Sequence, residues 1–356
     1  MPVRVFKLIL LLILCMSHLM LIVGQEASPM MTIESGEILT EAVWSPAETL
    51  IASGDIRGDV KVWAADSGEA LFQYHHEDSI IKLVWLDESR LLSVSMDGAI
   101  LIFEDEEIRP VRPAGEDLLF FAMDAAASHY ALITKDLEFE YWQVEGSESD
   151  WTATLEGVPG GISWAADGRR LNVWFNNGQI QVYDLSGEVL SYQIDVADPV
   201  KFMSWSEDQQ WLLVGFGARA QVYSLEKGPE PVGKAVVHDS FIINGRFSKA
   251  AERFISWGGD DTVMLSDTAS GDVLERFRLE DWIIDAQFNQ AEDQVMAASH
   301  IQIGVWPIDS TVMQSSFEHE ATVSGFQINA DDSRLLSWDW RGSLKVWDLS
   351  GTPDGE

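Results

Sequence analysis

Residues 341–351 read RGSLKVWDLSG, and this stretch contains the pattern that decides the fold. A turn dipeptide, Arg341-Gly342, precedes a short run of β-branched and aromatic residues that ends at Trp347. Glycine in that position allows a tight hairpin turn, and the apolar run that follows is typical of a short strand. The stretch therefore predicts a strand that leaves a hairpin and ends at Trp347.

The same pattern recurs through the chain with a period of about 40 residues. The last residues of the runs form an anchor column: Trp63, Phe103, Trp142, Tyr183, Tyr223, Ser266, Trp306 and Trp347. A second column lies about 19 residues before the first and comprises Trp44, Trp85, Met123, Trp164, Trp205, Phe247, Phe288 and Ile328. Because eight of the 15 tryptophans fall in these columns, the repeat is not a chance pattern.

Each unit has room for four short strands and lacks helical periodicity, which describes one blade of a β-propeller. Three motifs are specific: Val346-Trp347-Asp348, Trp44-Ser45-Pro46 and the Ser93-x-Ser95-x-Asp97-Gly98 segment. In these motifs, and over residues 30–350, the chain resembles the WD40-repeat β-propeller family. The resemblance implies an all-β fold and leaves the function almost undetermined.

Eight anchor residues predict an eight-bladed WD40-like propeller that forms a single domain over residues 25–351. The last unit ends after its third strand, and the first has spare sequence at Met30–Ser35. We expect this N-terminal segment to be the fourth strand of the last blade, which closes the ring. The alternative is seven blades, with one irregular unit as an extension.

The resemblance also implies a buried network of His, Ser, Asp and an anchor Trp within each blade. The matching residues are His76, Ser95, Asp97, His238, Ser256, Asp260, His319, Ser337 and Trp347. Arg341 occupies the expected position of the third Asp, so we expect no unit to have all four residues. The blades should therefore depend on packing more than on this network.

Residues 1–24 have the pattern of a secretory signal peptide, with Arg4 and Lys7 before an apolar run that ends at Gly24. The alternative is an uncleaved membrane anchor. Both predict that the remainder lies outside the cytoplasm, secreted or in a bacterial periplasm or cell envelope. Cleavage would also remove Cys15, the only cysteine, and exclude disulfides from the mature protein. We expect residues 352–356 to be a disordered tail.

The net charge of −35 argues against nucleic acid and anionic membrane surfaces as partners, because both require basic residues. The sequence has no nucleophile elbow, zinc motif, phosphate loop or calcium loop, so we expect no catalytic residue, metal or cofactor. The recurring His76, His238 and His319 share one repeat position, which favours a structural role over metal binding.

The loops before each first strand and between each second and third strand should form one binding face. The first set is rich in acids, and the second contains Arg57, Arg219 and Arg341. Phe241 and Trp282 share a repeat position, and Trp340 lies in a hairpin turn. We interpret these six residues as a partner-binding site, because Trp and Arg often dominate interface energy. Alternatively, Phe241 and Trp282 pack between blades and the arginines pair with nearby acids.

The sequence therefore predicts a monomeric, non-catalytic scaffold that binds a protein or peptide, with acidic loops that attract a cationic partner. One alternative is an envelope hydrolase or oxidoreductase with a dispersed site in the axial channel. Another is the sensor part of a larger envelope assembly, which an uncleaved anchor would favour.

Overall fold

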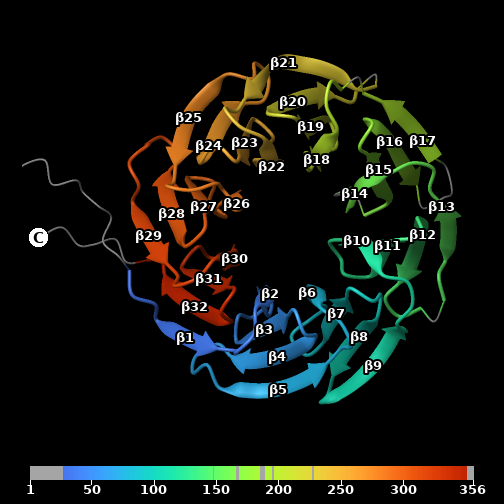
Figure 1. Ribbon diagram of the computed structural model, residues 1–356, viewed down its shortest axis with the longest axis vertical. Helices are drawn as coiled ribbons and strands as arrows, with labels where there is room; N and C mark the ends of the chain where they lie inside the picture. Colours follow the sequence, from blue (N-terminus) through green and yellow to red (C-terminus); the bar gives the residue numbers. More distant parts are fainter. Residues whose placement is uncertain are drawn as a thin grey trace, which may run out of the picture.

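The computed structural model describes residues 27–350 except 147, 166–167, 185–188, 195 and 227. The expected signal segment 1–24 and tail 352–356 lie outside these residues. In the described part of the chain, 32 strands form eight antiparallel four-stranded sheets, and helices are absent. The sheets stand as blades around a central axis (Figure 1). The predicted all-β, eight-bladed propeller is confirmed, and the seven-bladed alternative is wrong.

Blades 1 to 4 each consist of four consecutive strands, the first beside the axis and the fourth at the periphery (Figure 1). Blade 1 contains β2 (Leu39–Trp44), β3 (Leu50–Asp55), β4 (Asp59–Ala64) and β5 (Ala70–His75). Blade 2 contains β6 (Ile80–Trp85), β7 (Leu91–Ser95), β8 (Ile100–Glu104) and β9 (Glu107–Arg112). Blade 3 contains β10 (Leu118–Met123), β11 (His129–Thr134), β12 (Glu138–Gln143) and β13 (Trp151–Thr154). Blade 4 contains β14 (Pro159–Trp164), β15 (Arg170–Phe175), β16 (Gln179–Asp184) and β17 (Val189–Gln193).

Blades 5 to 7 follow the same order, whereas blade 8 combines both ends of the domain. Blade 5 contains β18 (Val200–Trp205), β19 (Trp211–Phe216), β20 (Arg219–Ser224) and β21 (Glu230–Val237). Blade 6 contains β22 (Ile242–Phe247), β23 (Arg253–Gly258), β24 (Thr262–Asp267) and β25 (Val273–Arg278). Blade 7 contains β26 (Asp285–Phe288), β27 (Gln294–Ala298), β28 (Gln302–Pro307) and β29 (Ser315–Glu318). Blade 8 contains β30 (Val323–Ile328), β31 (Arg334–Asp339), β32 (Ser343–Asp348) and β1 (Met31–Glu34).

Strand β1 closes the ring by pairing antiparallel with β32. Met31 lies opposite Val346 and Glu34 opposite Ser343. The backbone N–H of Met30 donates to Val346 O at 2.8 Å just before the strand. The predicted N-terminal closing strand is therefore confirmed.

The two columns of large residues fill the junctions between blades. One apolar cluster joins Trp257 of blade 6 to Trp306 of blade 7, and another joins Trp338 of blade 8 to Trp44 of blade 1. Fully burying one such side chain stabilises the fold by about 1.5–3 kcal/mol or more. Both faces of each sheet are therefore covered by its neighbours.

Several hairpins before the third strands have glycine where the backbone turns tightly, whereas Leu137 and Asp261 adopt the positive φ in blades 3 and 6. Gly342 has a φ of +83°, and a Cβ placed there would lie 2.4 Å from the carbonyl oxygen of Glu37. A side chain would thus meet both backbone strain and a clash. Gly58 in blade 1 is required for the same reason, because a Cβ there would lie 2.3 Å from His76 O.

Blade 8 contains the complete four-residue network, so the prediction that no unit has it is wrong. His319 Nδ1 lies 2.9 Å from Asp339 Oδ2, and its Nε2 lies 2.7 Å from Ser337 Oγ. Trp347 Nε1 donates to the same hydroxyl at 2.8 Å. The carboxylate comes from Asp339, two residues after the serine, instead of from position 341.

In blade 6 the aspartate of the network lies four residues after the serine, compared with two residues in blade 8. His238 Nδ1 lies 3.0 Å from Asp260 Oδ2, and its Nε2 lies 2.9 Å from Ser256 Oγ. Ser266 occupies the anchor position, and its hydroxyl has no partner among the described residues. This arrangement uses the three residues that the sequence grouped together.

Blade 2 differs from the prediction in its serine. His76 Nε2 lies 2.7 Å from Ser93 Oγ, whereas the Ser95 hydroxyl donates to Asp78 O at 3.1 Å. Tyr74 of blade 1 also donates its hydroxyl to Ser93, at 3.0 Å. Tyr74 thereby supplies the donor that the anchor residue Phe103 lacks. Asp97 accepts from the amide of Ala99 at 3.0 Å and makes no recorded bond to His76.

The buried His76 makes the stability of the fold sensitive to mild acid. Burial lowers the pKa of His76 to about 4, although the charge of Asp97 opposes the shift. An unfolded histidine takes up its proton near pH 6.5, so the unfolded state binds more protons between pH 6.5 and 4. We expect the free energy of unfolding to fall as the pH falls through this window. Urea denaturation at several pH values would measure it.

A His76→Gln variant provides the comparison. It removes the titrating group and should show a smaller loss of stability between pH 6.5 and 4 than the wild type. Parallel pH dependences for the two proteins would contradict the assignment of this effect to His76.

Candidate functional site: the loop face

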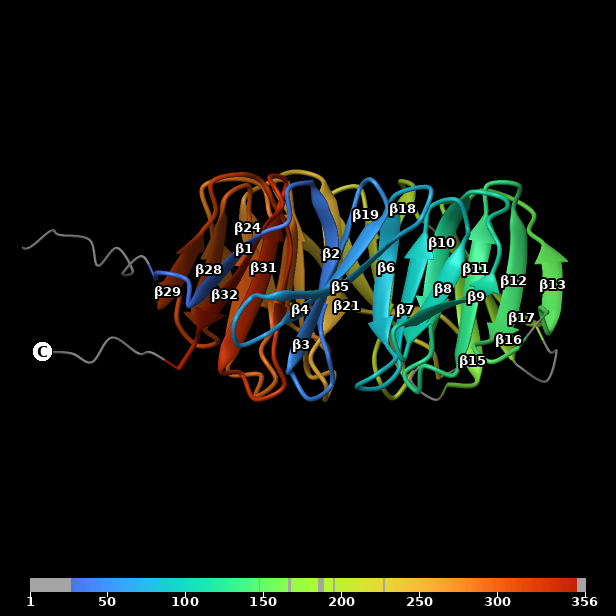
Figure 2. The same ribbon diagram turned by 90° about the horizontal axis from the view of Figure 1, so that it is seen from below.

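The loop face is the end of the propeller that carries the hairpins between second and third strands and the connections to each first strand. The opposite end, the turn face, carries the turns between first and second strands. Figure 2 shows the strands running between these two faces. Antiparallel pairing puts the corresponding loops of all eight blades at the same end.

Three predicted anchors lie exposed on consecutive blades of the loop face. Phe241 of blade 6 is 47% exposed, Trp282 of blade 7 is 50% exposed and Trp340 of blade 8 is 57% exposed. The rings of Phe241 and Trp282 meet edge to face, with their centroids 6.2 Å apart. The two rings thus form one apolar feature across a blade junction, and Trp340 is in the next blade.

The surrounding backbone fixes each aromatic residue. A Cβ at Gly259 would lie 2.6 Å from the Phe241 ring, so this glycine makes room for it. Trp282 precedes the fully buried Ile283, whose backbone N–H donates a hydrogen bond to Gly258 O of blade 6 at 3.3 Å. The amide of Trp340 donates to Thr322 O at 2.9 Å. Each ring therefore projects from an ordered loop.

Two further apolar residues extend this feature, and the sequence analysis did not identify them. Ile301 of blade 7 and Ile56 of blade 1 are each 42% exposed in hairpins before third strands. The loop-face arc is the set Phe241, Trp282, Ile301, Trp340 and Ile56, which spans blades 6, 7, 8 and 1. Ile56 occupies the hairpin position of Trp340, because Asp55-Ile56-Arg57-Gly58 matches Asp339-Trp340-Arg341-Gly342, and this match could have revealed it. Ile301 lies directly before β28 and has no such signal.

Two of the predicted arginines pair with acids. Arg57 Nε lies 3.1 Å from Glu37, and Arg341 Nη1 lies 3.4 Å from Glu320. Both guanidinium groups remain mostly exposed, so these pairs contribute little to stability. Arg219 is exposed at the start of β20 in blade 5, outside the loop-face arc.

Acidic side chains surround the loop-face arc. The connections before β22, β26 and β30 contribute the exposed residues Asp239, Glu280, Asp281, Glu318 and Glu320. Exposed acids of one sign create a local potential that attracts cations. The surface thus combines aromatic contact area with a negative rim.

The turn face uses its acids differently, because four of them bind the turn of the preceding blade. Ala47 N donates to Glu88 at 2.8 Å, Ala330 N to Glu48 at 2.8 Å, Gln290 N to Asp332 at 2.7 Å, and Lys249 N to Glu292 at 2.5 Å. We call these bonds the carboxylate clasps. They connect blades 2, 1, 8, 7 and 6 in sequence.

The clasps stop where the chain lacks an acid at the corresponding turn position. Glu48, Glu292 and Asp332 have positive φ angles of 57°, 57° and 60°. The residues in the same conformation in blades 3 to 6 are Ala127, Gly168, Gln209 and Ala251. None of these four residues has a carboxylate, so none of them forms a clasp between blades 2 and 6 in the part of the chain that the structure describes.

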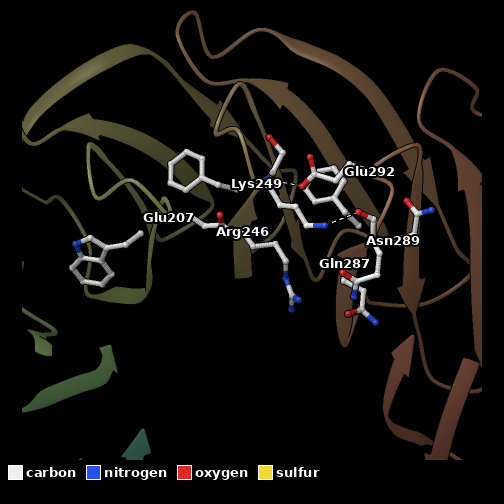
Figure 3. Close-up of a pocket in the computed structure, with 11 residues that line it drawn as sticks. Glu207, Arg246, Lys249, Gln287, Asn289 and Glu292 are labelled. Carbon is white, nitrogen blue, oxygen red and sulfur yellow. Dashed lines mark hydrogen bonds between the residues drawn. The ribbon is translucent and has the colours of Figure 1, made fainter. Parts of the chain in front are cut away.

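A pocket of about 170 Å³ opens on the turn face over blades 5, 6 and 7 (Figure 3). Its basic residues already have partners: Arg246 pairs with Asp285 at 2.8 Å, and Lys249 Nζ donates to Gln290 O at 2.6 Å. Glu292 accepts from the amide of Lys249 in one of the clasps. These contacts favour a structural function for the pocket residues.

The described residues give no support to an enzymatic site. They contain no group of three His, Cys, Asp or Glu side chains that could hold a metal ion. On the inner strands, charged residues pair across junctions, as Lys82 does with Glu41 at 2.5 Å. His76, His238 and His319 are each buried in a different blade. Over the same residues, no helix is long and apolar enough to cross a membrane.

Glu48 offers a test of the clasps, because it binds blade 8 from blade 1. Burial alone would raise its pKa, but hydrogen bonds from Ala330, Asn329 and Arg334 lower it. A Glu48→Gln substitution removes the charge that these donors face. We expect it to reduce the free energy of unfolding by about 1–3 kcal/mol, as measured by urea denaturation.

Glu207→Gln is the matched control, because Glu207 lies exposed in the equivalent turn of blade 5 and its carboxylate has no hydrogen bond or ion pair with another described residue. Its unfolding free energy should stay within about 0.5 kcal/mol of the wild type. Equal effects of the two substitutions would show that the clasp contributes nothing specific.

Comparisons with known proteins agree with the fold. No family model matches the chain. Periodic tryptophan protein 2 of Saccharomyces cerevisiae is 20% identical over 367 aligned positions, which cover 88% of this chain. The chain spans only 39% of the length of that relative.

Two solved structures have the same architecture. The C-terminal WD40 domain of Sif2 has a TM-score of 0.77 at 12% identity, and the match covers 92% of this chain and 99% of that domain. Chaetomium thermophilum Sqt1, solved bound to the N-terminus of the ribosomal protein L10, has a TM-score of 0.77 at 15% identity. That match covers 91% of this chain and 100% of Sqt1. These likenesses show that the chain has the WD40 propeller fold.

Proposed function

We propose that this WD40-like propeller is a non-catalytic scaffold that binds a protein or peptide on its loop face. The observation that carries the proposal is the loop-face arc, in which three aromatic side chains are about half exposed on consecutive blades. Exposed aromatic groups on ordered loops lose little conformational entropy when a partner covers them. The Sqt1 structure supports the proposal, because that propeller of the same fold is bound to a protein N-terminus.

The chemistry of the arc favours a cationic partner with apolar side chains. The apolar side chains would pack on Phe241, Trp282 and Trp340, while basic groups would approach the surrounding acids. Arg57 and Arg341 remain exposed enough to orient a carbonyl or carboxylate of the partner. Because the loops are ordered, we expect docking of a monomeric propeller without a large backbone rearrangement.

A displayed library of random peptides would test the binding face. We expect the wild type to select peptides that combine Lys or Arg with aromatic or large aliphatic residues. Trp282→Ala should weaken binding of a selected peptide by about 30-fold, since a central interface tryptophan typically contributes about 2 kcal/mol. Titration calorimetry would measure this, and added salt should weaken binding further.

Leu274→Ala is the control, because Leu274 is 47% exposed on the peripheral strand β25. It should bind the peptide as the wild type does, and both variants should keep the wild-type melting temperature. Selection of the same peptides by Trp282→Ala and by Trp340→Ala would contradict the choice of this face.

We also propose that the protein acts outside the cytoplasm, in a bacterial envelope or secreted from it. The signal pattern of residues 1–24 is the support for this location. Expression of the full chain in a bacterium should give a mature protein that begins at Gln25 and is recovered from the periplasm. A membrane-bound product that keeps Met1 would favour the anchor and a place in a larger envelope assembly. A cytoplasmic full-length product would contradict both.

A further inference from the structure

One buried position of the second strands is apolar in seven blades and polar in blade 4. On the first strand of each blade, one residue directly precedes the member of the second column, and the position in question is the residue of the second strand that pairs with it. This position is fully buried in the other seven blades. Its occupants are Ala52, Leu92, Ala131, Asn172, Leu213, Ile255, Met296 and Leu336. Asn172 is 1% exposed, so blade 4 has a buried amide where the other blades have a buried apolar side chain.

The Asn172 amide has an unused donor. Its Nδ2 has no hydrogen-bond partner among the described residues, and neither has the buried hydroxyl of Ser163, its neighbour across the β14–β15 pair. Buried polar groups are almost always bonded, because an unmade bond costs free energy. Two such groups side by side therefore need an explanation other than packing.

Both groups face the junction with blade 5. Side chains two residues apart on a strand share a face, and Trp174 packs with Met203 and Leu212 of blade 5. Asn172 is on the same face of β15 as Trp174. Val182, which pairs with Asn172 from β16, belongs to the same cluster.

Asn172 is one of the residues that line a pocket of about 280 Å³ between blades 4 and 5, and its amide nitrogen lies just beneath the pocket surface. The apolar and aromatic walls come from Val182, Tyr192, Trp205 and Leu225, and the charged residues of the lining are Arg170, Asp208 and Glu226. A second pocket of about 300 Å³ contains Ser163 and shares Trp205. Trp205 thus lines both hollows, and each hollow contains one unpartnered polar group.

Among the described residues, this junction also lacks a carboxylate clasp. Gln209 occupies the clasp position of blade 5, and its Nε2 donates at 3.1 Å to Ser206 O within its own turn. Gln209 therefore has no carboxylate to accept the backbone amides that the clasps bind in other blades.

We propose that the junction of blades 4 and 5 binds a small neutral or cationic aromatic molecule whose hydrogen-bond acceptor receives the Asn172 amide N–H. The Tyr192 and Trp205 rings suit a planar ligand, and a carbonyl or ring nitrogen suits the unused donor. The two acids Asp208 and Glu226 outnumber the one basic residue of the lining, Arg170, and together with the net charge of −35 they disfavour an anion. The pocket volume limits the ligand to about the size of one or two rings.

Ligand-observed NMR with nicotinamide and benzamide would test the proposal, with toluene as a probe that lacks an acceptor. For ligands of this size we expect a Kd of about 1 mM for the two amides. Asn172→Leu should weaken both amides at least tenfold and, because it restores the apolar residue type of the other blades, should raise the melting temperature. This combination distinguishes a binding residue from a structural one.

Tyr192→Leu is a second variant, which removes an aromatic wall from a half-buried position and should also weaken amide binding. Leu336→Asn, at the same repeat position in blade 8, should lower the melting temperature and leave amide binding unchanged. The proposal is overturned if the wild type binds neither amide at about 10 mM, ten times the expected Kd. It is also overturned if Asn172→Leu binds the amides normally or melts at a lower temperature than the wild type.

Discussion

Each blade of this protein has two apolar faces, and no single blade can bury both of them. The sheet needs a neighbour on each side, so the ring has to close, and the closing contact is made by β1 on β32. Met31 and Val346, which are opposite each other in this pair, are more than 300 residues apart in the sequence. All eight junctions depend on this pairing, because an open ring would expose the outer faces of blades 1 and 8 to water.

The sequence was sufficient for the fold because burial selects large apolar residues at a fixed period. Trp306 and Trp347 are each 1% exposed, and the repeat follows from their burial. The hydrogen-bond network was predicted less well, since spacing does not determine distance. A histidine reaches Asp339 two residues after its serine in blade 8, but in blade 6 it reaches Asp260, four residues after. One Asp position in the repeat therefore could not describe both blades.

For the candidate surfaces too, the sequence predicts features that depend on neighbouring residues and does not predict contacts between residues far apart in the chain. Exposure of Trp340 was expected from its place in a hairpin turn, whereas for Trp282 the sequence left open both exposure and packing between blades. The edge-to-face contact of Phe241 with Trp282 joins residues about one repeat apart, so it requires the three-dimensional arrangement. The unpartnered amide of Asn172 could not be predicted either, because a single Asn in a strand sequence reveals neither its burial nor its hydrogen-bond partners.

Acidic residues have different roles at the two ends of the propeller. On the turn face, Glu48, Glu88, Glu292 and Asp332 accept backbone amides of the preceding blade, so their charge is partly neutralised by the bonds that join the blades. The loop-face acids Glu280, Asp281 and Glu318 are exposed. The same charge thus strengthens the ring at one end and creates an attractive potential at the other. A cationic partner with apolar side chains would favour the loop face, because there exposed acids lie beside the exposed aromatic residues of the loop-face arc.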